Sequence, residues 1–434
     1  MPERAGAISR TIVCTATALA LLAAARASRA QMTDAMSGRD STAHASASAR
    51  IQAVGIISRV DPGIGTSART EAYLTQPMIM AHASALRGHV SGVLTLDFEG
   101  LTLERGQLTP GAYGEGYADR RHPHTYLHEA IAVVSGAVRG TGVSLAGGKG
   151  FATFGTDDPM VRPFAAYPVN HHLAQVLERY MIAGAVRRGP VSVEASVFNG
   201  DEPLSAGSAP DASRFGDSWA TRATLSARSG LELQGSYAFV TSPELVSGGG
   251  LDQRKWSAAA RIERASGPLR YALVEWATTE ALFGDVLTNR FTSVLAEAST
   301  EAKPVTLGLR YENTTRPEEQ RLTDPYRTSR SPTDLSILGI TRWQTVTATA
   351  SVPRRVGKLD VAPLVEVAYA RPTEELTPSA FVPRDFYGAS SIWMISGGLR
   401  LGLGPSHDRM GRYGVAVPNA RRSAASPHGG HTDH

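Results

Sequence analysis

The sequence predicts an all-β fold, a transmembrane antiparallel β-barrel of about 16 strands within a range of about 14 to 18. Apolar and polar residues alternate with a period of two in segment after segment, and short and long connections alternate between these segments. Charged residues make up only 19% of the 434 residues, which is below the ~25% of an average soluble protein. After residue 30 no run reaches the ~18 apolar residues that a membrane helix needs, so helical membrane proteins are excluded.

Residues 1–30 have the features of a secretory signal peptide. Two arginines give a basic start, residues 11–25 are apolar, and small residues precede the expected cleavage after Ala30. The one cysteine, Cys14, lies within this segment, so the exported chain is expected to contain no disulfide and no thiolate metal site. We therefore predict export, through a cleaved signal peptide, to the outer membrane of a Gram-negative-type bacterium.

The net charge of +4 does not indicate a nucleic-acid partner. Residues 1–30 contain four arginines and one glutamate, a net +3, so the remaining chain carries about +1. No nucleic acid is expected as a partner. The expected partners are outer-membrane lipid, the barrel-assembly machinery, and small solutes or ions.

The exported chain divides into three parts. Residues 31–49 are rich in Ser, Ala, Met and Asp without periodicity, and we predict a flexible N-terminal segment. Residues 50–403 are predicted to form the barrel. Residues 404–434 form a polar tail that contains several histidines and is predicted to be disordered, with weak metal binding as the alternative. The tail does not end in the aromatic residue that the assembly machinery reads in many barrel proteins.

Strict alternation identifies the strands. It is clearest in residues 191–199, 231–239, 256–264, 305–312 and 399–403. In the first of these the valines alternate with Ser192, Glu194 and Ser196. A period of two places one set of side chains on each face of a strand.

The connections support a membrane barrel, because outer-membrane barrels have short periplasmic turns and long external loops. Short turns are expected at 87–89, 139–142, 188–190, 229–230, 265–268, 301–304 and 353–358. Long connections are expected at 61–74, 101–127, 151–177, 200–217, 242–253, 280–290, 315–333 and 371–389. Residues 151–177, with three prolines, are the best candidate for a loop folded into the lumen.

Charged residues are predicted to line the lumen. Those on the polar faces of the strands are Glu194, Arg222, Arg261, Glu263, Arg310, Glu312, Glu366 and Arg400. A soluble β-sandwich shows the same periodicity, but these charges could not sit in its core, although they could face its solvent side. A sandwich protein of this length would need two or three domains, and the sequence contains no linker to separate them. Mixed positive and negative groups indicate either weak selectivity or closure by salt bridges.

Histidines cluster in the long connections. The motif at 119–129, Asp-Arg-Arg-His-Pro-His-Thr-Tyr-Leu-His-Glu, contains His122, His124 and His128, and a later connection contains His171 and His172. Imidazole with carboxylate is a ligand set for Zn or Cu(II), so these five are the candidate metal ligands. The alternative is a hydrogen-bonded plug at the barrel mouth. Adjacent His171 and His172 would point to opposite sides of an extended chain.

Met78 and Met80, close to His82, would suit Cu(I). No Gly-x-Ser-x-Gly elbow occurs, and residues 147–150 lack the spacing of a phosphate loop. The sequence predicts no enzyme, no catalytic residue and no cofactor, with Cu or Zn as the alternative.

Two of these elements resemble a known family. The Asp-Arg-x-His-Pro-His core at 119–124 and the Phe-Asn-Gly-Asp-Glu-Pro element at 198–203 resemble those of uncharacterised bacterial outer-membrane barrel proteins. The resemblance covers roughly residues 50–403. It implies a porin-like barrel in the outer membrane, often encoded near metal-resistance and copper-efflux genes.

The sequence thus predicts a porin-like barrel that passes small solutes or ions through a polar lumen. Two alternatives stay open: a barrel that handles copper or zinc, and an outer-membrane enzyme or non-conducting structural barrel.

Overall fold

The structure is a computed structural model, and it describes most of the residues from 45 to 417. The described ranges are 45–63, 67–103, 107–110, 112–113, 124–156, 159–203, 205–227, 230–264, 266–319, 337–375, 381–405 and 409–417. The predicted signal peptide, His122 and residues 418–434 lie outside them.

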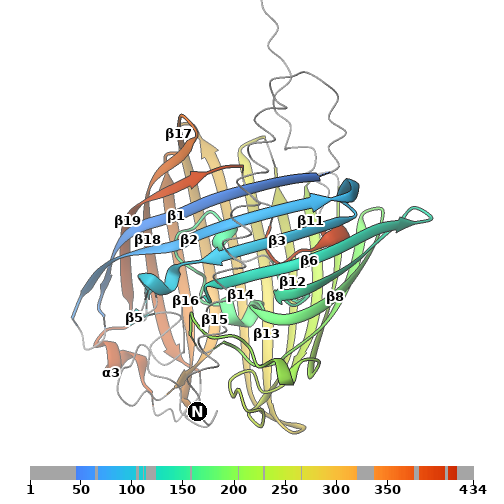
Figure 1. Cartoon of the computed structure of the whole chain (residues 1–434). Helices are drawn as coiled ribbons and strands as arrows, with labels where there is room; N and C mark the ends of the chain where they lie inside the picture. Colours follow the sequence, from blue (N-terminus) through green and yellow to red (C-terminus); the bar gives the residue numbers. More distant parts are fainter. Residues whose placement is uncertain are drawn as a thin grey trace, which may run out of the picture.

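Sixteen long strands form one closed antiparallel sheet (Figure 1). They are β1 (Ala45–Asp61), β2 (Arg69–Ala85), β3 (Val90–Asp97), β6 (Leu127–Val138), β7 (Thr141–Gly150), β8 (Arg179–Arg188), β9 (Val191–Phe198), β10 (Ser218–Ser226), β11 (Leu231–Val240), β12 (Asp252–Glu263), β13 (Leu269–Phe283), β14 (Val286–Ala302), β15 (Val305–Glu319), β16 (Ile337–Ser351), β18 (Leu359–Glu374) and β19 (Ile392–Leu403). Each pairs with the next, and β1 pairs with β19 as well as β2, so the sheet closes on itself. The predicted fold and strand number are confirmed.

Three short strands complete the sheet structure. β17 (Arg354–Val356) pairs with β18 within the turn that follows β16. β4 (Leu108–Thr109) and β5 (Ala112–Tyr113) pair with each other as a separate ribbon.

The two faces of the wall have opposite chemistry. Val193 on β9 is 51% exposed, whereas its neighbour Glu194 is 2% exposed. The same contrast separates Val274 (54%) from Glu275 (0%) on β13. The outer face is therefore apolar and the charged groups point inward, as the alternation predicted. An apolar outer band with a polar interior is typical of barrels that sit in lipid.

Aromatic residues divide between the two faces. Trp219, Trp276, Trp393 and Tyr311 are 42–51% exposed on the outside. Trp343 is fully buried inside, beneath the guanidinium of Arg316, whose central carbon lies 3.9 Å from the ring centroid. Outward-facing aromatic side chains fit a membrane girdle, whereas Trp343 faces inward and packs inside the lumen.

The connections differ at the two ends of the barrel. Figure 1 shows the turn with β17 at the top of the view and α3 (Pro383–Tyr387) among the connections at the bottom. One predicted long connection is wrong: residues 280–290 belong to β13 and β14, which are joined by a tight turn at Gly284 and Asp285. The barrel also starts earlier than predicted, because β1 begins at Ala45 rather than at residue 50.

Helices are few and short. They are α2 (His171–Ala174), α3, and the 3₁₀ turns η2 (Leu86–Gly88), η3 (Glu99–Leu101), η4 (Pro159–Val161), η5 (Ala212–Arg214) and η6 (Gly414–Ala416). Within the described ranges none is long and apolar enough to cross a membrane.

Candidate functional site

Residues 151–156 and 159–177, called here the inner loop, lie inside the barrel. The loop starts against β9 and β10, where the hydroxyls of Thr153 and Ser196 lie 3.0 Å apart and Thr153 Oγ1 donates to Ala220 O at 3.0 Å. It then crosses to the opposite wall. There the backbone N–H groups of Ala165 and Ala166 each donate to the Glu366 carboxylate at 3.0 Å.

Charged wall residues hold the loop where it crosses. Arg310 donates to Ala166 O at 2.8 Å, Arg400 donates to Phe164 O at 3.0 Å, and Val169 N donates to Glu312 at 2.6 Å. These three wall residues and Glu366 are among those predicted to line the lumen. The structure places them inside the barrel and uses them to fix a polypeptide segment.

A buried ion cluster lies under the loop. Arg162, on the loop itself, has Nη1 3.6 Å from Glu297 and Nη2 4.0 Å from Glu275. Arg310 Nε lies 2.8 Å from the same Glu297. All four side chains are at most 3% exposed. Buried charges are stable only when they are paired and hydrogen-bonded, so this cluster requires the loop to be docked.

Residues 409–417, called here the C-terminal plug, also lie inside the barrel. They were predicted to belong to a disordered tail, and the structure differs. Arg409 forms a bidentate pair with Glu232, at 2.7 and 2.9 Å. Arg412 contacts Glu194 at 3.2 Å and Glu232 at 3.1 Å. The reason is electrostatic: arginines from the tail neutralise carboxylates that strand periodicity points into the lumen.

The plug continues along the wall after Arg412. Tyr413 Oη donates to Glu129 at 2.8 Å and accepts from Phe151 N at 3.0 Å. Arg187, on β8, donates to Val417 O at 2.8 Å. In Figure 1 the red η6 turn lies against the wall beside β6.

Arg222 connects the two internal segments. Its guanidinium pairs with Glu194 at 2.6 and 2.8 Å, and it donates to Gly155 O of the inner loop and to Gly411 O of the plug. Burial lowers the pKa of Arg412 to about 9, with the nearby positive charge of Arg222 as the next cause. Arg412 therefore stays charged at neutral pH.

The remaining predicted lumen residues form a separate pair. Arg261 Nη2 lies 3.0 Å from Glu263 Oε2. Arg261 is buried, whereas the Glu263 side chain is 36% exposed near the end of β12.

The structure brings together three of the predicted metal ligands. The rings of His124 and His128 are 4.9 Å apart, and those of His124 and His171 are 5.4 Å apart. His172 lies beyond His171, with the two ring centroids 5.2 Å apart, and its Nδ1 is 3.3 Å from Glu202. The two histidines lie in the helix α2 rather than in an extended segment, so their rings stay in contact instead of pointing to opposite sides. His122 is not among the described residues.

Acidic and basic groups that the sequence did not single out surround these histidines. Asp97 and Glu99 approach His124, while Glu178 accepts from His128 Nδ1 and from Thr125 N, at 2.9 and 2.8 Å. Burial raises the pKa of Glu178, but the positive charge of Lys149 and the hydrogen bond with His128 outweigh this effect, so the pKa lies well below the usual 4.5. No spacing rule marks these residues, because they come from the ends of different strands.

The two methionines predicted to suit Cu(I) lie next to the histidines, and Met78 is the cross-strand partner of Asp97. Met78 and Met80 are 1% and 2% exposed, in an apolar cluster with Met160, Met410 and Tyr167. The cluster contains residues of the wall, the inner loop and the plug, so these thioethers contribute to apolar packing inside the barrel.

The Phe-Asn-Gly-Asp-Glu-Pro element fixes the loop after β9. Asn199 Oδ1 accepts from Tyr180 N at 2.7 Å, and Asp201 Oδ2 accepts from Asp211 N at 2.6 Å. A Cβ on Gly200 would lie 2.0 Å from Thr241 O. The element is therefore a loop-folding device that also presents Glu202 to His172.

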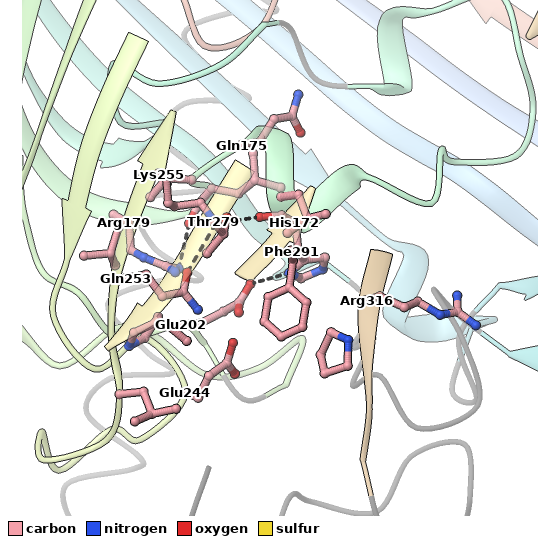
Figure 2. A pocket seen from close by; sticks show the side chains of 18 of the residues that line it. His172, Gln175, Arg179, Glu202, Glu244, Gln253, Lys255, Thr279, Phe291 and Arg316 are labelled. Carbon is pink, nitrogen blue, oxygen red and sulfur yellow. Dashed lines mark hydrogen bonds and ion pairs between the residues drawn. The ribbon is translucent and has the colours of Figure 1, made fainter. Parts of the chain in front are cut away.

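A cavity of about 110 Å³ opens at this end of the barrel (Figure 2). Figure 2 shows Lys255, Glu202 and Gln253 around it, with Phe291 on one side. Lys255 Nζ donates to His172 O at 3.1 Å and to Thr279 at 2.9 Å. The lining carries both charge signs and one aromatic ring, which suits a small polar solute.

Comparisons with known proteins bear on the fold. No protein-family model matches the chain, and no curated protein matches its sequence. The outer-membrane channel DcaP of Acinetobacter baumannii aligns with a TM-score of 0.50 at 10% identity, over 85% of this chain and 100% of that one. The anion-selective porin from Comamonas acidovorans aligns at 0.49 and 12% identity, over 83% and 100%.

At these identities the likeness concerns the fold alone. The sequence motif and the gene context stay predictions. The chain has the porin-type fold, a closed antiparallel barrel of sixteen long strands.

Proposed function

We propose that the protein is a porin-like channel of the outer membrane that passes small solutes or ions. The observation that carries this proposal is the division of the wall into an apolar outer face and a charged inner face, both seen on β9 and β13. A barrel of this kind is stable in lipid and provides a polar path across it. Export through a cleaved signal peptide and insertion by the barrel-assembly machinery belong to the same proposal.

Passage is limited by the inner loop and the C-terminal plug. The inward charges are bonded to these segments and are at most 3% exposed in Glu194, Arg222, Arg310 and Glu312. An open, water-filled lumen would leave such groups hydrated. We propose that the resting channel conducts weakly and that displacement of either segment opens it.

We propose no catalytic role. The inward acids and bases bind one another and the two internal segments, so they are engaged in structure. This supports a channel over the outer-membrane enzyme that the sequence left open.

The test is single-channel conductance in planar bilayers. Deletion of residues 160–170 removes the part of the inner loop that crosses the lumen, and we expect conductance to rise several-fold. A Gly-Ser insertion after Gly284, in an exposed hairpin turn, is the control and should leave conductance unchanged. Equal conductance of the deletion variant and the native protein would reject the constriction. Absence of conductance in every variant would favour a structural barrel.

A further inference from the structure

We propose that Asp97, Glu99 and His124 form a binding site for one divalent transition-metal ion, with Zn²⁺ as the probe. The site lies inside the long-loop end of the barrel, at the end of β3 and the start of η3. It goes beyond the channel function, and its ligand set differs from the three histidines that the sequence motif suggested.

The geometry of the three side chains suits chelation. One ligand atom from each lies within 4.8 Å of the other two. His124 Nδ1 is 2.9 Å from Glu99 Oε2 and 3.7 Å from Asp97 Oδ2. With Zn–N and Zn–O bonds of about 2.0–2.2 Å, neighbouring ligands in a metal shell lie roughly 3 Å apart. The two separations from His124 Nδ1 lie on either side of this value.

One carboxylate oxygen in the site lacks a hydrogen bond. Within the described part of the chain Asp97 Oδ2 accepts none, although Asp97 is 0% exposed. Its other oxygen accepts from Glu99 N at 2.8 Å, which fixes the side chain and aims Oδ2 at His124. A buried carboxylate oxygen without a donor is costly. A bound cation removes that cost.

Glu99 is held with one oxygen toward the site. Tyr167 Oη donates to Glu99 Oε1 at 2.8 Å, and Gln76 N donates to the same oxygen at 3.1 Å. Oε2 is the atom that faces His124. The carboxylate is therefore positioned to offer one oxygen to a metal.

His124 has a partner for its other nitrogen. Nε2 lies 3.3 Å from His171 Nε2, and His171 is stacked on Tyr167 with ring centroids 5.3 Å apart. When Nδ1 binds a metal it carries no proton, so Nε2–H donates to His171. Metal-bound histidines commonly donate their second N–H to a fixed acceptor, which sets the tautomer and the ring orientation.

The donor types select the class of metal. Two carboxylates and one imidazole suit Zn²⁺ and similar divalent ions better than Cu(I), which prefers thioethers and thiolates. The three protein ligands leave room for water or another ligand.

The experiment is equilibrium dialysis of metal-free folded protein against Zn²⁺, with bound metal measured by mass spectrometry. His428, His431 and His434 are replaced by Asn throughout, so that the end of the chain does not contribute. We expect one Zn²⁺ per chain, at least tenfold weaker binding in Asp97→Asn, and at least a hundredfold weaker binding in His124→Gln. Two variants serve as matched controls and should bind within twofold of the parent: His89→Gln, at an exposed turn, and Glu318→Gln, a buried carboxylate on β15.

No saturable binding by the parent overturns the proposal, as does binding that His124→Gln leaves unchanged. Folding of each variant is checked by circular dichroism. Where a variant does not fold, the absorption spectrum of the parent protein with Co²⁺ replaces the comparison. Co²⁺ bound in the site should give visible bands of mixed nitrogen and oxygen coordination, and a spectrum identical to that of aqueous Co²⁺ would reject the proposed site. Because no conductance is measured, the outcome is independent of the channel function.

Discussion

Replacement of Arg412 by Met should release the C-terminal plug. Arg412 is 4% exposed and contacts Glu194, Thr224 and Glu232, with a further hydrogen bond to Gln234. Methionine is shorter than arginine, but it is also unbranched at Cβ and has neither charge nor donors. The change therefore removes the plug's central contacts while it preserves packing volume.

The free-energy cost of Arg412→Met depends on the ion pairs that Glu194 and Glu232 keep. Removing one partner of a buried ion pair costs about 3–5 kcal/mol. Glu194 keeps Arg222 and Glu232 keeps Arg409, so neither carboxylate is left alone and the lower value of about 3 kcal/mol applies. At ~1.4 kcal/mol per tenfold change, the ratio of displaced to docked plug should rise about a hundredfold.

Cysteine labelling measures this ratio. Ala416 is 1% exposed in the docked plug, and the chain's one natural cysteine lies in the predicted signal peptide. In an Ala416→Cys background, Arg412→Met should raise the rate of maleimide labelling about a hundredfold, following the ratio worked out above. Arg290→Met, which removes an exposed arginine paired with Glu280, is the control. A labelling rate within twofold of the parent's would refute the reasoning, provided that circular dichroism shows the barrel folded.

Three further predictions concern stability, measured by denaturant unfolding. In the folded protein the pKa of Glu178 lies below its usual 4.5, so its stabilising contribution is present above pH 4.5 and is lost as the pH falls. Between pH 7 and pH 3 the free energy of unfolding should therefore fall more for the native protein than for Glu178→Gln. Gly155 has φ +70°, and a Cβ there would lie 1.7 Å from a backbone oxygen, so Gly155→Ala should cost at least about 2 kcal/mol. Gly189 has open space around it, so Gly189→Ala should cost only about 1 kcal/mol. Val274→Arg, at mid-strand on the outer face, should cost about 2–4 kcal/mol in lipid, and Val286→Arg, beside a turn, about 0–1; equal costs would contradict the membrane placement.

Local periodicity was sufficient to predict the wall. Alternation on one strand decides which side chains face lipid, so the orientation of Val193 and Glu194 needs no knowledge of the neighbouring strands. The length and prolines of residues 151–177 were sufficient to suggest an inner loop. The strand ends were less predictable: residues 280–290 have turn-like composition, yet the ladder continues to Phe283.

The internal partners were beyond the reach of sequence patterns. Arg409 and Glu232 are 177 positions apart, and the plug has no periodicity of its own. Asp97 and Glu99 lie at the end of an ordinary strand, where a carboxylate commonly faces solvent, so the sequence does not mark them as ligands. The His motif gave one ligand of the candidate metal site, His124, but neither carboxylate, because which atoms meet depends on how separate strand ends pack.

The distance between the last strand and the plug has a kinetic consequence. Residues 404–408 alone separate the end of β19 from Arg409, and five residues reach at most about 18 Å. A displaced plug thus stays at an effective concentration in the millimolar range or above. A free peptide with the sequence of residues 409–417 would have to reach that concentration to compete. Openings caused by plug release should accordingly be brief and frequent, and should lengthen when the plug is deleted.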